Sequence, residues 1–96
     1  MPRAARQKPR RLAEKLTEIR TRLDLSQNGM LKHMGLEDQL TREEVSAFER
    51  GVRIPSIPVL LRYARAAGVC LDTLADDELN LPSRLPSRPK HRKFLI

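Results

Sequence analysis

The chain has 96 residues, enough for one small domain with a single core and too few for a catalytic cleft between two domains. Its net charge of +7 favours a polyanionic partner, and its aromatic content of 3% predicts an aliphatic core. Cys70 is the only cysteine, so an internal disulfide is excluded and a reducing, cytoplasmic compartment is expected. The sequence has no apolar run that could span a membrane and no apolar segment typical of a secretory signal.

The positive charge gathers at the two ends of the chain. Residues 1–11 and residues 83–96 each hold five Lys or Arg side chains and no acid. Residues 12–82 hold the other nine cations and all 12 acids, so this central part is formally −3. Cations that lead into a helical domain are suited to phosphate contact or minor-groove insertion. We therefore predict such a contact for a basic N-terminal arm, residues 1–10, with a merely solvated arm as the alternative. The cations assigned to this contact are Arg3, Arg6 and Lys8.

Side chains for catalysis or metal binding are sparse. His33 and His91 are the only histidines, and no cluster of Cys, His or Asp has the spacing of metal ligands. Adjacent acids such as Glu43 and Glu44 point about 100° apart on a helix, so they do not form a catalytic carboxylate pair. The sequence therefore predicts no enzyme activity, no cofactor and no metal site.

Apolar spacing and capping residues predict five helices and no strand. The first spans residues 10–23, where Leu12, Leu16, Ile19 and Leu23 recur at i, i+4, i+7 and i+11. This spacing places them on one face of the helix, which we expect to face the core.

Two short helices joined by a turn are predicted next, over residues 27–34 and 42–50. A serine caps the start of the first, and a capping box of threonine and glutamate opens the second. Each is expected to end at a glycine, the residue that most readily adopts a left-handed conformation. The residues that mark these starts and ends are Ser26, Gly35, Thr41, Glu44 and Gly51.

The last two predicted helices span residues 56–67 and 72–79, with Asp72 as the expected cap of the second. Residues 81–96 form an extended tail in this prediction, because closely spaced prolines do not fit a continuous helix. These prolines are Pro82, Pro86 and Pro89.

Residues 11–79 resemble the helix-turn-helix domain of lambdoid phage repressors and Cro proteins, the XRE-like family. The matching residues keep their order along the chain: Leu25-Ser26-Gln27, Gly35, Val45-Ser46, Glu49-Arg50-Gly51, Pro55-Ser56 and Ala67-Gly68-Val69. The resemblance implies a five-helix, lambda-repressor-like domain over residues 11–80, with the basic arm before it and the tail after it. It also implies a bacterial or phage-type cytoplasmic protein associated with the nucleoid.

The resemblance implies sequence-specific binding to double-stranded DNA by a transcriptional regulator, most simply a repressor. In such domains the start of the second helix of the motif meets base edges in the major groove. Arg42 can pair with guanine and Glu43 with cytosine. The full base-reading set implied by the family is Arg42, Glu43, Ser46 and Ala47. The backbone-contacting set outside the arm is Gln27, Thr41, Arg50 and Arg53. Arg20 and Glu49 match a structural ion pair of the family.

The turn of the motif departs from the family pattern. The sixteen steps from Gly35 to Gly51 are four more than the family usually has, and Leu31 stands where a small alanine is usual. We therefore expect the second helix of the motif to be displaced or re-angled. The altered turn and the formal −3 of the central region support an alternative function, a protein-interaction module such as an antitoxin or an adaptor.

A homodimer is expected, because one helix-turn-helix unit reads only a few base pairs and the family pairs two units on neighbouring half-sites. The predicted contact lies after Gly68, in leucines that exceed the need of one small core. These are Leu71, Leu74, Leu79 and Leu81. The alternative is that they cover the first and fourth helices of a monomer.

Overall fold

A computed structural model describes residues 9–85 and shows five α-helices within them. The helices are α1 (Leu12–Arg22), α2 (Gln27–Met34), α3 (Arg42–Glu49), α4 (Ile57–Ala67) and α5 (Leu71–Ala75). No strand occurs between residues 9 and 85, so the all-α prediction is confirmed for this part of the chain. None of the five helices has the length and apolar character needed to cross a membrane.

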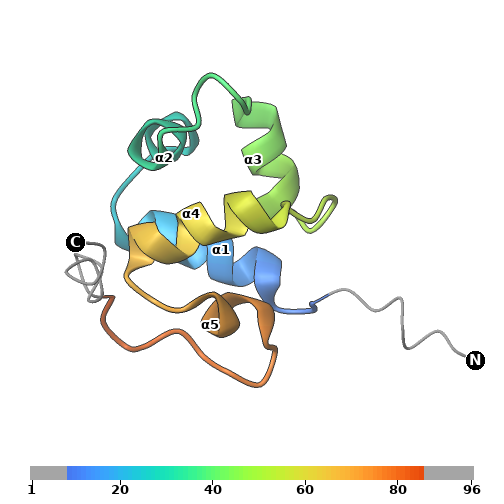
Figure 1. Cartoon of the computed structure of the whole chain (residues 1–96), viewed down its shortest axis with the longest axis vertical. Coiled ribbons are helices and arrows are strands. Elements are labelled where there is room, and N and C mark those ends of the chain that lie inside the picture. Colours follow the sequence, from blue (N-terminus) through green and yellow to red (C-terminus); the bar gives the residue numbers. More distant parts are fainter. Residues whose placement is uncertain (1–8, 86–96) are drawn as a thin grey trace, which may run out of the picture.

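α1 and α4 pack against each other in the middle of the molecule (Figure 1). α2 and α3 lie on one side of this pair and pack against each other, whereas α5 lies on the other side against α1 and α4 (Figure 1). The unit formed by α2, the turn and α3 therefore faces away from α5.

One apolar core joins all five helices. The predicted face of α1 is confirmed for Leu12, Leu16 and Ile19, which are buried, and Leu23 packs against the same core. Burial of a large aliphatic or aromatic side chain contributes about 1.5–3 kcal/mol. The other buried core residues are Met30, Leu31, Met34, Leu36, Val45, Phe48, Leu60, Tyr63, Ala64, Ala67 and Leu74.

The predicted caps of α2 and α3 are present. The Ser26 side chain accepts a hydrogen bond from the Gly29 amide at 2.9 Å. Thr41 and Glu44 form the complete capping box, in which the Thr41 hydroxyl accepts from the Glu44 amide and the Glu44 carboxylate accepts from the Thr41 amide. α2 ends at Gly35 with a φ of 71°, a left-handed conformation that glycine adopts without a steric cost.

The longer turn between α2 and α3 has a buried residue of its own. The Leu36 side chain is buried in the core, and its carbonyl accepts hydrogen bonds of 2.9 Å from the amides of Gln39 and Leu40. The extra residues therefore form a compact turn that is attached to the core. The expected displacement of α3 relative to the family stays a prediction.

The last helix differs most from the prediction. It spans Leu71–Ala75 instead of residues 72–79, and its N-cap is Cys70, so the prediction of Asp72 as cap was wrong. The chain leaves the helix at Asp76, which has an extended conformation. The buried Lys15 ammonium donates to the carbonyls of Thr73 and Asp76, each at 2.8 Å, and thereby satisfies backbone groups at this helix end.

Residues 81–85 contain no helix, as predicted for the start of the tail. The Arg22 guanidinium donates to the Pro82 carbonyl at 2.5 Å, and the side chains of Leu81 and Leu85 pack against the core. The remainder of the predicted tail lies outside the described residues.

Candidate nucleic-acid interface

The first turn of α3 presents two unpaired charged side chains. Arg42 and Glu43 are exposed, and neither side chain has a hydrogen bond or an ion pair with another described residue. Val45 and Phe48 bury the opposite face of the helix in the core. The helix is therefore fixed on its inner side, while Arg42 and Glu43 are available to a partner.

Ala47 does not belong to this exposed face. Its exposed fraction is 7%, and its carbonyl accepts hydrogen bonds from the amides of Val52 at 2.9 Å and Arg53 at 3.3 Å. Ala47 therefore exposes little surface to a base, and its role as a base-reading residue stays a prediction. Consecutive side chains lie about 100° apart on a helix, so the neighbour of the buried Phe48 lies at the margin of the core. The loop after α3 turns back there, so that its amides reach the Ala47 carbonyl.

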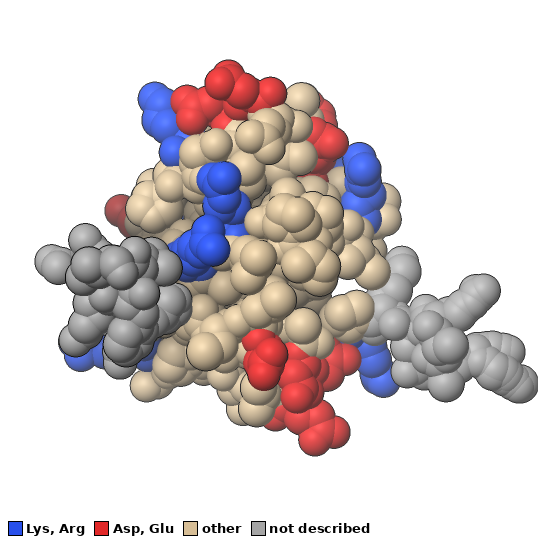
Figure 2. All heavy atoms as spheres, in the orientation of Figure 1, with Lys and Arg blue, Asp and Glu red and all other residues tan. Residues whose placement is uncertain are grey.

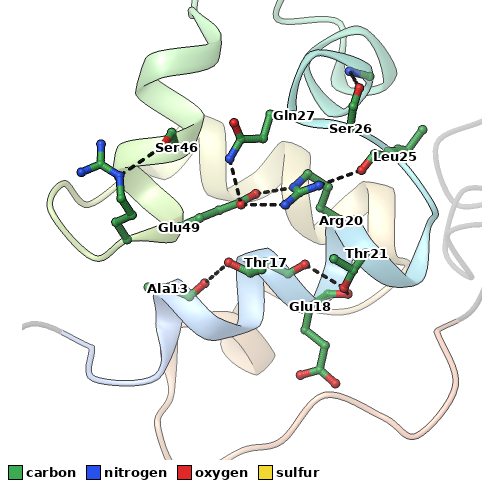
Figure 3. Close-up of polar contacts among 12 residues, drawn as sticks. Ala13, Thr17, Glu18, Arg20, Thr21, Leu25, Ser26, Gln27, Ser46 and Glu49 are labelled. Carbon is green, nitrogen blue, oxygen red and sulfur yellow. Dashed lines mark hydrogen bonds and ion pairs between the residues drawn. The ribbon is translucent and has the colours of Figure 1, made fainter.

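Ser46 and Arg50 form a pair on the outer side of α3. The Arg50 Nε donates to the Ser46 hydroxyl at 3.1 Å (Figure 3). Arg50 is exposed and keeps its terminal guanidinium nitrogens for another acceptor. The two residues lie one turn apart, so a contact of Arg50 with a phosphate would also hold Ser46 close to the same partner.

The side chains of Gln27 and Thr41 have partners within the protein. Gln27 Nε2 donates to Glu49 Oε1 at 3.2 Å (Figure 3). The Thr41 hydroxyl and amide both belong to the capping box with Glu44. The second amide hydrogen of Gln27 is still available to a phosphate, whereas Thr41 would have to exchange an intramolecular bond for the contact.

Arg20 and Glu49 come together in a two-pronged ion pair (Figure 3). The Arg20 Nε lies 2.7 Å from Glu49 Oε2, and its Nη2 lies 3.0 Å from Oε1. The side chains are 18% and 7% exposed. The hydrogen bonds to Glu49 raise the pKa of Arg20 above its ordinary value. Because Arg20 also donates to the Leu25 carbonyl and Gln27 donates to Glu49, this group joins α1, α2 and α3.

The buried hydroxyl of Tyr63 was not identified from the sequence. It has no hydrogen-bond partner among the described residues, and burial raises its pKa above the ordinary value of 10.0. Tyr63 is the only tyrosine, and its spacing from the apolar residues of α4 indicates burial without indicating a partner for the hydroxyl. Its role in the structure is to fill the core.

Acidic side chains surround the exposed end of α3. Glu37 and Asp38 are exposed in the α2–α3 turn, and Glu43 and Glu44 belong to the first turn of α3. Figure 2 shows acidic side chains gathered at this end of the molecule. The Glu44 carboxylate lies 3.5 Å from Arg53 Nη1. The positive charge of Arg53 therefore weakens the repulsion between Glu44 and an anionic partner. Arg42 is a cation that lies among these acidic side chains in the first turn of α3.

A small cleft connects the root of the N-terminal arm with the loop after α3. Pro9 and Arg10 line one wall, and Gly51, Arg53 and Ile54 line the other. The cations at this cleft therefore come from two segments that are about forty residues apart in the sequence. The arm residues Arg3, Arg6 and Lys8 lie outside the described residues.

The described residues contain no group of three or more His, Cys, Asp or Glu side chains that could hold a metal ion. Comparison with known proteins gives no match to a family model, to a curated protein or to a solved structure.

Proposed function

We propose that this chain is a sequence-specific double-stranded DNA-binding protein of the XRE-like helix-turn-helix type, acting as a transcriptional regulator in the bacterial or phage-type nucleoid. The observation that carries the proposal is the first turn of α3. Arg42 and Glu43 are exposed and unpaired there, while the capping box and the buried residues Val45 and Phe48 hold the helix in place. Such a preorganised short helix is suited to entering a major groove.

The proposed base contacts follow from the chemistry of the two side chains. The Arg42 guanidinium can donate two parallel hydrogen bonds to guanine O6 and N7, and the Glu43 carboxylate can accept from cytosine N4. The Glu43 carboxylate also repels phosphates, so binding in a register that places a phosphate beside it is disfavoured. A G·C pair read by adjacent residues is therefore expected within the binding site.

Backbone contacts in this proposal come from the cations beside α3. Arg50 is exposed at the end of the helix, and Arg53 is 59% exposed in the following loop. Arg10 lines the same cleft as Arg53, so the basic arm starts beside this loop. Phosphate contacts of this kind orient a protein on the duplex without reading its sequence.

The proposal is tested by selecting binding sites from a random duplex pool with the full chain and measuring affinity for the selected and scrambled duplexes. We expect sequence preference to persist at 150–200 mM salt, and Arg42→Ala to weaken specific binding by about 1–3 kcal/mol and relax the preference at one position. Arg65→Ala is the matched control, because Arg65 is an exposed arginine on α4. If Arg42→Ala weakened binding to all duplexes equally, Arg42 would contact only a phosphate and would not read a base.

A second candidate function is a protein-interaction module, such as an antitoxin or an adaptor, whose α2–α3 end binds a basic protein. The acidic side chains around Arg42 favour this candidate, since they repel phosphates and attract cations. It predicts that no preferred sequence emerges from the random pool and that duplex binding disappears as salt is raised. A selected sequence that is retained at 150–200 mM salt would exclude it as the main function.

A further inference from the structure

The loop after α3 turns back toward that helix. Gly51, which begins the loop, has a left-handed conformation with a φ of 76°. The amides of Val52 and Arg53 then donate to the Ala47 carbonyl, at 2.9 Å and 3.3 Å. Ala47 and Glu44 are three positions apart and are therefore neighbours on the helix. These bonds hold the backbone of Arg53 within reach of the Glu44 side chain.

The two oxygens of the Glu44 carboxylate have different partners. Oε1 accepts from the Thr41 amide at 2.9 Å and completes the capping box of α3. Oε2 lies 3.5 Å from Arg53 Nη1. One carboxylate therefore connects the first turn of α3 with the loop that follows the helix.

This ion pair distinguishes Arg53 from Arg50, the other cation assigned to the DNA backbone beside α3. The Arg50 Nε donates to the Ser46 hydroxyl, a neutral group that leaves the positive charge uncompensated. Arg53 faces a carboxylate instead, and the two side chains of the pair are 59% and 31% exposed. A phosphate can therefore reach Arg53, but it has to compete with Glu44 for the guanidinium.

From this geometry we infer that Glu44 is an intramolecular competitor of DNA, which holds the Arg53 guanidinium and thereby lowers the affinity of the chain for duplexes of any sequence. A contact of Arg53 with a phosphate first has to offset the loss of its pair with Glu44. Phosphate contacts carry no sequence information, so this competition acts equally on matched and unmatched sites. The inference rests on the proposed DNA-binding function.

The substitution Glu44→Gln separates this role from the capping of α3. Glutamine is the other residue typical of this place in a capping box, because its amide oxygen also accepts from the amide of the N-cap residue. The variant therefore retains the acceptor for Thr41 and removes the charge that faces Arg53. Circular dichroism and thermal melting check that the helices persist.

The test is a double-mutant cycle of Glu44→Gln and Arg53→Gln in the full chain. Affinities are measured for a selected and a scrambled duplex at about 150 mM salt. We expect Glu44→Gln to raise the affinity for both duplexes about threefold to fivefold, the upper size typical of an exposed ion pair. When Arg53→Gln is also present, Glu44→Gln should raise it less than about 1.5-fold, because the guanidinium that it would release is absent.

Two controls separate the ion pair from general charge repulsion. Glu37→Gln removes an exposed acid of the α2–α3 turn that has no ion pair with Arg53, so its effect should be the same with and without Arg53→Gln. Arg50→Gln should leave the gain from Glu44→Gln unchanged. If Glu44→Gln did not fold, the single variants would decide, since Arg53→Gln should then lower the affinity less than Arg50→Gln does. A loss from Arg53→Gln that is equal or larger would overturn the inference.

The other outcomes of the cycle are equally decisive. No gain from Glu44→Gln, or the same gain with and without Arg53→Gln, would overturn the inference while DNA binding remains. A gain confined to the selected duplex would also overturn it, because Glu44 would then act on the reading of bases. A wild-type chain that fails to bind duplex DNA would overturn both the inference and the proposed function.

Discussion

The Glu49 carboxylate of α3 accepts three hydrogen bonds from side chains of α1 and α2. Two nitrogens of Arg20 and the amide of Gln27 donate to it, and its side chain is 7% exposed. A carboxylate that is largely removed from water needs such donors, because burial of an unpaired charge costs several kcal/mol. Glu49 therefore has a structural role, although it lies on the helix assigned to DNA contact.

Removal of one partner of this pair should destabilise the fold. We expect Arg20→Ala and Glu49→Ala each to lower the free energy of unfolding by about 3 kcal/mol, because each leaves the other charge without its partner. The double variant should cost less than the sum of the two. Urea denaturation followed by circular dichroism measures all three.

Glu18→Ala is the matched control for this cycle. Glu18 forms a surface ion pair with Arg22 one turn later, and such pairs contribute about 0–1 kcal/mol. Small and additive effects of Arg20→Ala and Glu49→Ala, no larger than that of Glu18→Ala, would show that the pair does not stabilise the fold.

Local sequence chemistry predicted the helix boundaries wherever the capping partner is a neighbour. Ser26 and the Thr41–Glu44 box cap α2 and α3 through residues three positions apart, and Gly35 ends α2 through its own backbone freedom. The start of α1 and the end of α5 were placed less well. Their partners, Asp77 and Lys15, come from distant parts of the chain.

In the candidate site, too, features set by neighbouring residues could be predicted and features set by the path of a loop could not. Helical spacing places Val45 and Phe48, which are buried, on one face of α3 and leaves Arg42 and Glu43 on the outer face. It did not predict that Ala47 is buried or that its carbonyl accepts from two amides of the loop after α3. Those bonds depend on how the loop turns back, which the spacing of residues within the helix does not specify.

At the scale of elements, the bonds between α1 and the segment after α5 predict a pH dependence. The Arg11 and Arg10 amides, with the charges of Lys15 and Arg10, lower the pKa of Asp77 below its ordinary value of 3.8. Ionised Asp77 therefore stabilises the folded chain. This contribution is complete above about pH 4–5 and is lost as the pH falls through the lowered pKa of the folded state.

Denaturation of the wild type and Asp77→Asn between pH 2 and pH 7 measures this contribution. The wild type should be the more stable protein at neutral pH, and the difference should vanish at the acidic end, where its Asp77 is protonated. Asp72→Asn serves as the control, and its stability should follow that of the wild type throughout. A difference between wild type and Asp77→Asn that does not change with pH would contradict the assignment to ionised Asp77.

At the scale of the whole molecule, most of the leucines expected to form a dimer contact belong to the core of one chain. Leu74 is completely buried, and Leu71 and Leu81 pack against the same core. Leu79 differs from them with an exposed fraction of 42%. The expectation that all four exceed the need of one core was therefore wrong for Leu74, while the homodimer itself stays a prediction.

The position of α5 bears on how a dimer could bind DNA. It lies on the opposite side of α1 and α4 from α2 and α3 (Figure 1). A two-fold contact through the segment after Gly68 would therefore leave the first turn of α3 in both copies uncovered. The same two-fold axis would relate the two half-sites on the DNA.

Sedimentation equilibrium at micromolar concentration, with Leu79→Asp as the probe, tests this contact. If two copies meet after Gly68, the substitution should raise the dimer dissociation constant without lowering the stability of the monomer, since Leu79 is exposed. Leu74→Asp does not serve this purpose, because a charge at a fully buried position should unfold the chain. Val52→Asp is the control, since Val52 is 60% exposed in the loop after α3. Dissociation by Val52→Asp alone would place the contact beside α3, and a monomeric wild type bound to one asymmetric site would refute the dimer.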